Sequence, residues 1–225
     1  MKFTFYGQSC FLLELGAKKF LFDPFITGNE LAKEIDINAI EADYILVSHG
    51  HGDHTADLIS IAQRTGALVI SNFEIVTWLG KQGITNAHPM NFGSYDFEFG
   101  TLTYMQAQHS SSLPDGTYAG AAGGFILNSE PGNFYYSGDT SLMLDMQLVP
   151  YYAKVDVAIL PIGGNFTMNV KDALQASGFI QCDNIVGVHF DTFGYIKIDH
   201  EKAETLFSEA GKKILIPEIG ATYDV

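Results

Sequence analysis

The chain has 225 residues, which is long enough to bury a sizeable core, and this length predicts a single domain spanning residues 1–225. Its 26 Asp and Glu outnumber its 12 Lys and Arg, and this acidic balance argues against nucleic acid and anionic lipid as partners. No stretch approaches the ~18 apolar residues that span a bilayer, and the N-terminus lacks a secretory signal pattern, so we expect a cytoplasmic protein with no membrane contact.

The chain opens with short runs of aromatic and aliphatic residues, separated by turns that contain glycine or polar residues. These runs are residues 2–6, 10–15 and 19–25. Apolar runs divided by turn residues predict neighbouring strands, so we expect an antiparallel meander. Residues 43–48 form another apolar run with polar residues on both sides, which is the pattern of a buried strand.

Helix and strand patterns alternate after this strand. Residues 55–66 have the apolar spacing of a helix that ends at Gly66. Residues 67–71 predict a strand, and residues 72–83 predict a helix capped by Asn72.

Further apolar runs in the second half of the chain each end in a small polar cluster and predict strands. They cover residues 101–112, 133–141, 155–165 and 184–192. A last helix over residues 199–211 precedes a closing strand over residues 212–219. Strands interleaved with helices predict a layered α/β domain, with sheets inside and helices outside.

The most informative stretch is HGHGDH, directly after the strand at 43–48. It holds His49, His51, Asp53 and His54. The two glycines lack a Cβ, which lets the loop curl and bring the first two imidazoles to one point. Imidazole and carboxylate are ligands of Zn²⁺ and similar ions. Four donors on so short a turn exceed what one tetrahedral ion takes, so the pattern predicts two ions.

Three candidate ligands occur further along the chain. His109, Asp139 and His189 each follow an apolar run. Proteins with α/β folds place reactive groups at strand ends, so we expect these side chains to complete the site. His88 and His200 lack this setting.

Each candidate also has a structural alternative. The HGHGDH turn could be a polar loop at a helix start, and His109 could lie in a surface loop. Asp139 could be a turn residue, and His189 an ordinary core or edge histidine. Three crowded imidazoles would repel one another if protonated and would cost free energy to desolvate, so a metal site is the simpler interpretation of the turn.

Two other segments have a candidate role beside the metals. Asp23 could accept a hydrogen bond from a ligand histidine and fix its tautomer, or it could cap the turn before Pro24. The sequence PIGGNFTM, residues 161–168, predicts a pocket wall or only a tight turn before a capping box at 169–172. The predicted wall residues are Gly163, Gly164, Asn165 and Thr167. Asp191, close after His189, leaves the charge preference of the pocket open.

The order His-x-His-x-Asp-His, then a lone His, a Gly-Asp and a final His, resembles the metallo-β-lactamase superfamily over nearly the whole chain. The sequences SHGHGDH and PIGGNFTM resemble a narrower branch of metal-dependent hydrolases related to ascorbate-6-phosphate lactonase. The resemblance implies an αββα sandwich with the metal site at one edge of the two sheets. It also implies that His49, His51 and His109 hold the first ion, that Asp53, His54 and His189 hold the second, and that Asp139 bridges them.

This resemblance, together with the ligand set, predicts a dinuclear metal-dependent hydrolase. Two divalent ions lower the pKa of a shared water, and the resulting hydroxide attacks a small ester, lactone or related bond. Asp53 is the candidate for orienting or deprotonating that water. Zn²⁺ is the expected metal, with Mn²⁺, Fe and Ni²⁺ as alternatives. A phosphodiesterase or nuclease of the same fold, and a non-catalytic metal-binding protein, are the alternative functions. The expected partner is a small-molecule substrate, and a homo-oligomer is left open.

Overall fold

The computed structural model describes all residues, 1–225. They form two compact units, and each unit is built around one seven-stranded sheet. Unit 1 contains residues 1–91, 110–122 and 218–224. Unit 2 contains residues 92–109 and 123–217, with residue 225. The single domain over residues 1–225 stays a prediction.

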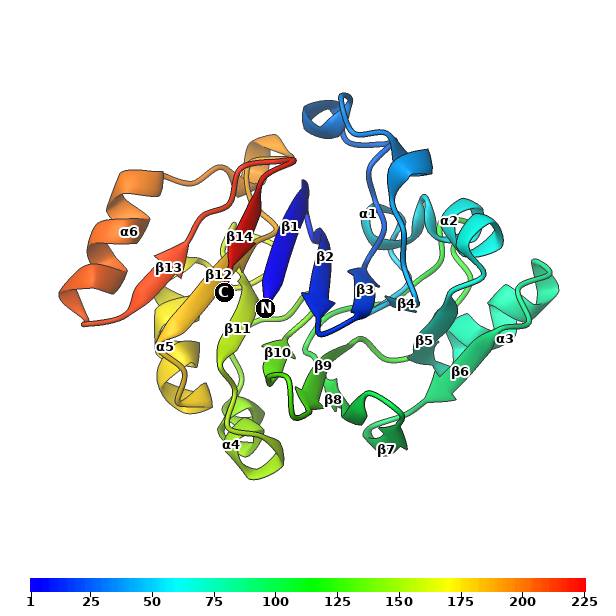
Figure 1. The fold of residues 1–225 in the computed structure, drawn as a ribbon. Helices are drawn as coiled ribbons and strands as arrows, with labels where there is room; N and C mark the ends of the chain where they lie inside the picture. Colours follow the sequence, from blue (N-terminus) through cyan, green and yellow to red (C-terminus); the bar gives the residue numbers. More distant parts are fainter. The chain divides into compact units, whose positions relative to one another are not determined.

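The sheet of unit 1 has the strand order β14-β1-β2-β3-β4-β5-β6 (Figure 1). Its strands are β1 (Lys2–Gly7), β2 (Cys10–Leu15), β3 (Lys18–Phe22), β4 (Tyr44–Leu46), β5 (Leu68–Asn72), β6 (Ala87–Met90) and β14 (Thr222–Asp224). Strands β1 to β3 pair antiparallel, which confirms the predicted meander, and β3 to β6 pair parallel. The parallel strands therefore end at one edge of the sheet, where their following loops gather.

Helices connect these parallel strands. They are η1 (Glu30–Ala32), η2 (Ile37–Ala39), α1 (Gly52–Thr55), α2 (Leu58–Thr65) and α3 (Phe73–Lys81). The predicted caps are confirmed: Gly66 ends α2 with a left-handed φ of 68°, and the Asn72 side chain accepts a hydrogen bond from Ile75 N. The helix predicted over residues 55–66 is wrong at its start, because α1 and α2 are separate. Asp57 lies between them, and its carboxylate accepts hydrogen bonds from Ile26 N and Thr27.

The sheet of unit 2 has the strand order β13-β12-β11-β10-β9-β8-β7. Its strands are β7 (Gly93–Phe97), β8 (Gly100–Gln106), β9 (Gly123–Asn128), β10 (Phe134–Tyr136), β11 (Val157–Pro161), β12 (Asn184–Val188) and β13 (Lys213–Leu215). Strands β7 to β10 pair antiparallel and β10 to β13 pair parallel. All residues of β11 are buried, and in β12 all but the exposed Asn184 are buried, as expected of apolar strands in a parallel part of a sheet.

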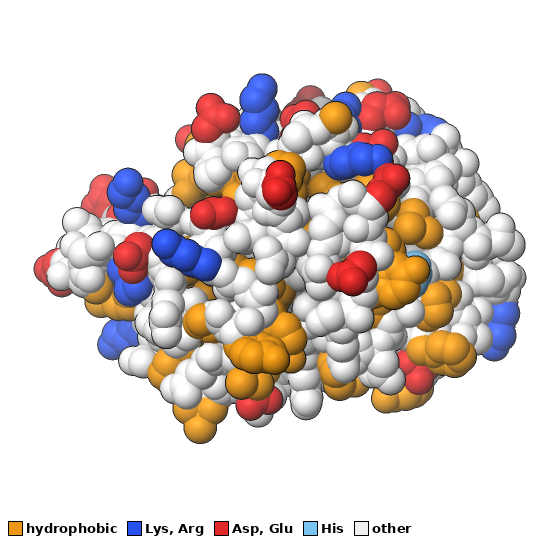
Figure 2. All heavy atoms as spheres, turned by 60° about the horizontal axis from the view of Figure 1, so that its bottom comes forward, with side chains coloured by type: hydrophobic (Ala, Val, Ile, Leu, Met, Phe, Trp, Pro, Cys, Tyr) orange, Lys and Arg blue, Asp and Glu red, His pale blue; other side chains and the backbone are white.

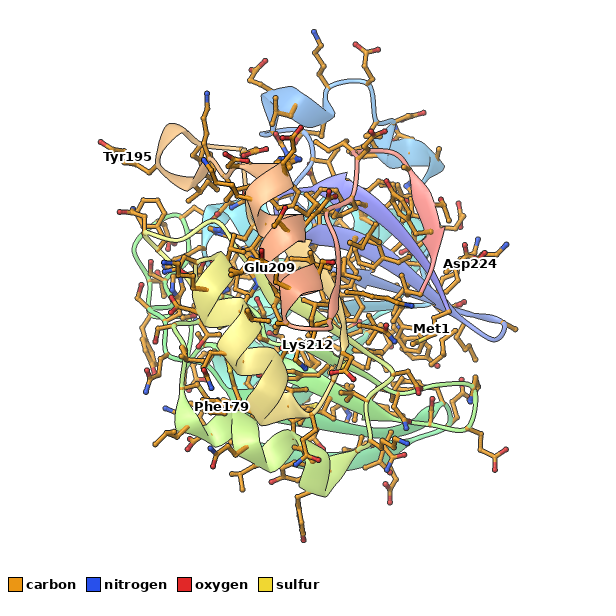
Figure 3. The ribbon with its side chains drawn as sticks, turned by 90° about the vertical axis from the view of Figure 1, so that its left-hand side faces the viewer. Met1, Phe179, Tyr195, Glu209, Lys212 and Asp224 are labelled. Carbon is orange, nitrogen blue, oxygen red and sulfur yellow. The ribbon has the colours of Figure 1, made fainter.

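The helices of unit 2 are η3 (Leu144–Leu148), α4 (Val149–Tyr152), α5 (Val170–Ile180), η4 (Gly194–Ile196) and α6 (His200–Glu209). Helices α5 and α6 lie side by side (Figure 3, where Phe179 and Glu209 mark them). Asn169 and Asp172 form the predicted capping box at the start of α5. No helix in the structure combines the length and the apolarity needed to cross a bilayer.

Candidate metal centre

In unit 1, the HGHGDH turn leaves the end of β4. His49 follows this buried strand and is fully buried, while His51 is the N-cap of α1. Gly50 is required by a close approach, because a Cβ at this position would lie 2.3 Å from Ala119 Cβ. The buried strand β4 and the close packing of Gly50 against Ala119 therefore fix the position at which the turn begins.

The structure brings the side chains of this turn together. His49 Nε2 lies 2.9 Å from His51 Nδ1, and the ring centroids of these residues are 4.6 Å apart. The ring of His54 lies 4.1 Å from that of His49, between centroids. Asp53 Oδ2 is 3.7 Å from His54 Nε2. Three imidazoles and one carboxylate of unit 1 thus form a cluster of nitrogen and oxygen donors.

Asp23 lies behind this cluster and is fully buried. Its Oδ1 accepts a hydrogen bond from Ser48 N at 2.7 Å, and its Oδ2 accepts one from Ser48 Oγ at 2.6 Å. Its Oδ2 also lies 2.8 Å from His54 Nδ1. Because a carboxylate only accepts hydrogen bonds, His54 donates from Nδ1, and its Nε2 keeps the lone pair that a metal ligand needs. The geometry supports the tautomer-fixing interpretation of Asp23.

The sequence analysis did not identify Gln8, whose Nε2 donates a hydrogen bond to Asp53 Oδ2 at 2.9 Å. The only local signal was Gly7, which interrupts the alternation of the first strand and has a φ of 101°. A contact across 45 residues has no signature in either segment alone.

In unit 2, the three downstream candidates also converge. His189 Nε2 lies 3.0 Å from Asp139 Oδ2, and His109 Nε2 lies 3.6 Å from the same oxygen. Asp139 and His189 are both only 2% exposed. The His109 and Asp139 loops are tied together, because Gln108 N donates to Thr140 Oγ1 at 3.0 Å. Asp139 therefore has one carboxylate oxygen facing both histidines.

The loop that carries His189 has unusual backbone geometry. His189 has a φ of 55°, in the left-handed region, and a Cβ on Gly163 would lie 2.2 Å from His189 O. Gly163 is therefore needed for close packing against this loop. Asp191 accepts hydrogen bonds from Ile198 N and His200 Nε2, so its carboxylate is engaged within the loop.

The pocket wall predicted over residues 163–167 stays a prediction, and the structure shows how this segment folds. Gly163 lines a cavity of ≈ 560 Å³ with Asn169, Lys197 and other residues of unit 2. The remaining predicted wall residues do not line this cavity: they are Gly164, Asn165 and Thr167. Gly164 and Asn165 have φ values of 72° and 56°, and Gly164 N donates to Met168 O, which is the geometry of a tight turn.

The chemistry of the donors fits divalent transition ions in both units. Each unit presents imidazole nitrogens beside a carboxylate, the combination that Zn²⁺ and similar borderline ions prefer. The cysteines add no ligand, because Cys10 and Cys182 are free and buried, and burial raises the pKa of both thiols.

Comparison with known proteins places the chain in a family. Residues 2–189 match the beta-lactamase superfamily domain. A UPF0173 metal-dependent hydrolase of Christiangramia forsetii is 52% identical over 227 residues, covering 100% of both chains. One from Flavobacterium johnsoniae is 52% identical over 226 residues with the same coverage. Among solved structures, Igni18, a metallo hydrolase from Ignicoccus hospitalis, has a TM-score of 0.89 and 30% identity, and covers 100% of this chain and 98% of that chain.

These matches confirm the predicted α/β class and the metallo-β-lactamase fold, while the finer relation to ascorbate-6-phosphate lactonase stays a prediction. The aligned region extends over the full length of both relatives, so the comparison covers both units. The chain therefore belongs to the UPF0173 family of metal-dependent hydrolases within the beta-lactamase superfamily.

Proposed function

We propose that this chain is a dinuclear metal-dependent hydrolase that cleaves a small ester, lactone or related bond. The observation that carries the proposal is the imidazole cluster of unit 1, in which the His49 ring centroid lies 4.6 Å from that of His51 and 4.1 Å from that of His54. His49 and His54 are fully buried and His51 is half-buried. Imidazoles this close, beside the Asp53 carboxylate, are costly to desolvate without a cation. Membership of a metal-dependent hydrolase family independently supports the metal dependence and the hydrolytic reaction.

The proposed ligands divide between two ions. His49, His51 and His109 would hold the first, and Asp53, His54 and His189 the second. Asp139 would bridge them, and the geometry of unit 2 supports this role. Its Oδ2 faces His109 and His189, which are assigned to different ions, at 3.6 Å and 3.0 Å from their Nε2 atoms.

Asp23 and Asp53 would have different roles beside the bound ions. Bound divalent ions supply Lewis acidity, which lowers the pKa of water and offsets negative charge on the attacked group. Asp23 holds His54 in the tautomer whose Nε2 can bind a cation. The Asp53 side chain is 25% exposed, so it can reach both solvent and substrate. We assign Asp53 the role of orienting the attacking water and accepting its proton.

Hydrolysis is favoured over redox chemistry by the ligand at position 51. A carboxylate at this position would suit a di-iron redox centre in relatives of this fold, because carboxylates favour iron. This chain has His51 instead. We propose Zn²⁺ as the metal, and Mn²⁺, Fe and Ni²⁺ remain alternatives because availability weighs as much as ligand type. Two free, buried thiols suit a reducing compartment, which supports the proposed cytoplasmic location.

A small molecule is the proposed substrate. The formal net charge is −14, and Figure 2 shows acidic and basic side chains scattered over one face of the molecule without a basic patch on that face. A long polyanion would be repelled by such a surface at low salt.

Turnover of a substrate panel tests the proposal. Metal-reloaded protein should hydrolyse p-nitrophenyl acetate and simple lactones, and metal-stripped protein should not. Faster hydrolysis of bis-p-nitrophenyl phosphate would instead make the protein a phosphodiesterase. A metal-loaded protein that is inert to both classes, yet binds a metabolite tightly, would have a non-catalytic function.

A further inference from the structure

The hairpin that joins β1 to β2 has a buried polar tip. Gly7 pairs with Cys10, so Gln8 and Ser9 form the loop between the strands. Loop residues normally lie on the surface, where water satisfies their polar groups. Here Gln8 is 1% exposed and Ser9 is fully buried. Gln8 Oε1 and Ser9 Oγ are both buried without a hydrogen-bond partner. Buried polar atoms of this kind require an explanation beyond closing a hairpin.

The backbone at this tip is also strained. Gln8 has a φ of 54°, in the left-handed region that residues with long side chains rarely adopt. Such conformations persist where the surroundings impose them, and they cluster at functional sites. This backbone holds the Gln8 side chain where its Nε2 donates a 2.9 Å hydrogen bond to Asp53 Oδ2.

That hydrogen bond has a specific consequence for Asp53. A donor fixed on Oδ2 sets the rotation of the carboxylate, and therefore the direction in which Oδ1 faces. Gln8 Oε1 is bonded to the same carbon as Nε2, so a hydrogen-bond acceptor also lies beside this carboxylate. A primary amide supplies a donor and an acceptor together, whereas a carboxylate at this position would repel Asp53.

We propose that Gln8 is a positioning residue of the metal centre. Its Nε2 orients Asp53 toward the second ion, and its Oε1 accepts a hydrogen bond from the water that Asp53 orients. This inference rests on the proposed function, in which Asp53 is a ligand of that ion. Residues that orient metal ligands contribute strongly to metal affinity, and their replacement typically weakens it about 10–100-fold.

Gln8→Asn separates positioning from folding. Asn tolerates the left-handed region better than Gln, so the hairpin should keep or gain thermal stability. Its side chain is one methylene shorter, so its amide does not reach Asp53. Full-length protein is stripped of metal and titrated with Co²⁺, and the visible absorption follows the filling of two sites. We expect the second Co²⁺ to bind about 10–100-fold more weakly, with Tm of the metal-free protein unchanged or higher.

Two other variants complete the test. Gln8→Met keeps the length of the side chain without its amide, and should weaken the second site as Gln8→Asn does. Ser9→Ala changes the neighbouring residue of the same tip, and should titrate like the wild type. Unchanged affinity in both Gln8 variants would overturn the inference, as would a parallel loss of Tm and affinity in all three variants. Wild-type protein that takes up no second ion would contradict the proposed function itself.

Discussion

At the scale of single residues, hydrogen bonds decide which atoms of the histidines are available to a cation. Asp23 engages His54 Nδ1, and Ser48 Oγ lies 3.0 Å from His49 Nδ1. In both rings Nδ1 is therefore engaged by a neighbouring side chain, and Nε2 is the nitrogen left to bind a cation. Neutral imidazoles with one nitrogen hydrogen-bonded are the form in which histidine ligates metals.

His51→Ala should remove most of the bound metal and abolish turnover, because it deletes a proposed ligand of the first ion. The matched variant is His88→Ala, on the edge strand β6, where desolvation lowers the pKa of the imidazole and no other candidate ligand lies on its strand. It should keep both metal and activity. Elemental analysis of the two purified variants checks this, and equal metal in both would mean that the site is misplaced.

Asp23→Asn should weaken metal binding about 10–100-fold, since an amide at this position holds His54 Nδ1 less firmly than a carboxylate. It also weakens the charge-assisted bonds from Ser48, so we expect a loss of about 1–3 kcal/mol in the free energy of unfolding. Zinc titration and urea unfolding measure the two effects. An unchanged zinc affinity would assign Asp23 to the turn alone.

At the scale of elements, the site depends on turns at strand ends that only small residues permit. Gly50→Ala places a Cβ 2.3 Å from Ala119 Cβ, so we expect a loss of about 1–3 kcal/mol in unfolding free energy. Gly52→Ala is the matched control, because its Cβ would meet no atom nearer than Pro114 Cγ at 3.8 Å. Urea unfolding compares the two.

A double variant that combines Gly50→Ala with Ala119→Gly tests the contact between these two residues. Ala119→Gly removes the atom nearest to the new Cβ and leaves Ser112 C and O at 3.2 Å, so the double variant should regain part of the stability lost in Gly50→Ala. If the double variant is no more stable than Gly50→Ala, the cause lies in the backbone of the turn and not in this contact.

Elements with local signals could be predicted from the sequence, and elements with distant partners could not. Caps such as Asn72 and Asn169 satisfy donors two or three residues away, and both were predicted. Strand β14 was missed because only pairing with β1, at the other end of the chain, defines it. Strand β6 contains Pro89, which masks its pattern and is tolerated because β6 is an edge strand.

The same distinction applies to the candidate site. The spacing of HGHGDH pointed to metal chemistry, and each downstream candidate was found at the end of an apolar run. Gln8 was missed because its partner lies 45 residues away. The pocket wall over Gly163, Gly164, Asn165 and Thr167 stays a prediction, because the composition of a glycine turn does not reveal its φ values or its backbone contacts.

At the scale of the whole molecule, the two cysteines report on whether the units unfold together. Cys10 lies in unit 1 and Cys182 in unit 2, and both are buried. If residues 1–225 are one cooperative domain, both thiols should become reactive toward a thiol reagent at the same urea concentration. Peptide mapping of the labelled protein resolves the two. Separate midpoints would show that the units unfold independently.

The metal content of the protein tests the central claim most directly. The chain is purified without chelators, and bound metal is measured by elemental analysis against protein concentration. The proposed ligand sets predict about two divalent ions per chain, with zinc predominant. A chain that folds and is stable but retains no divalent metal, and takes up none on titration, would contradict the account.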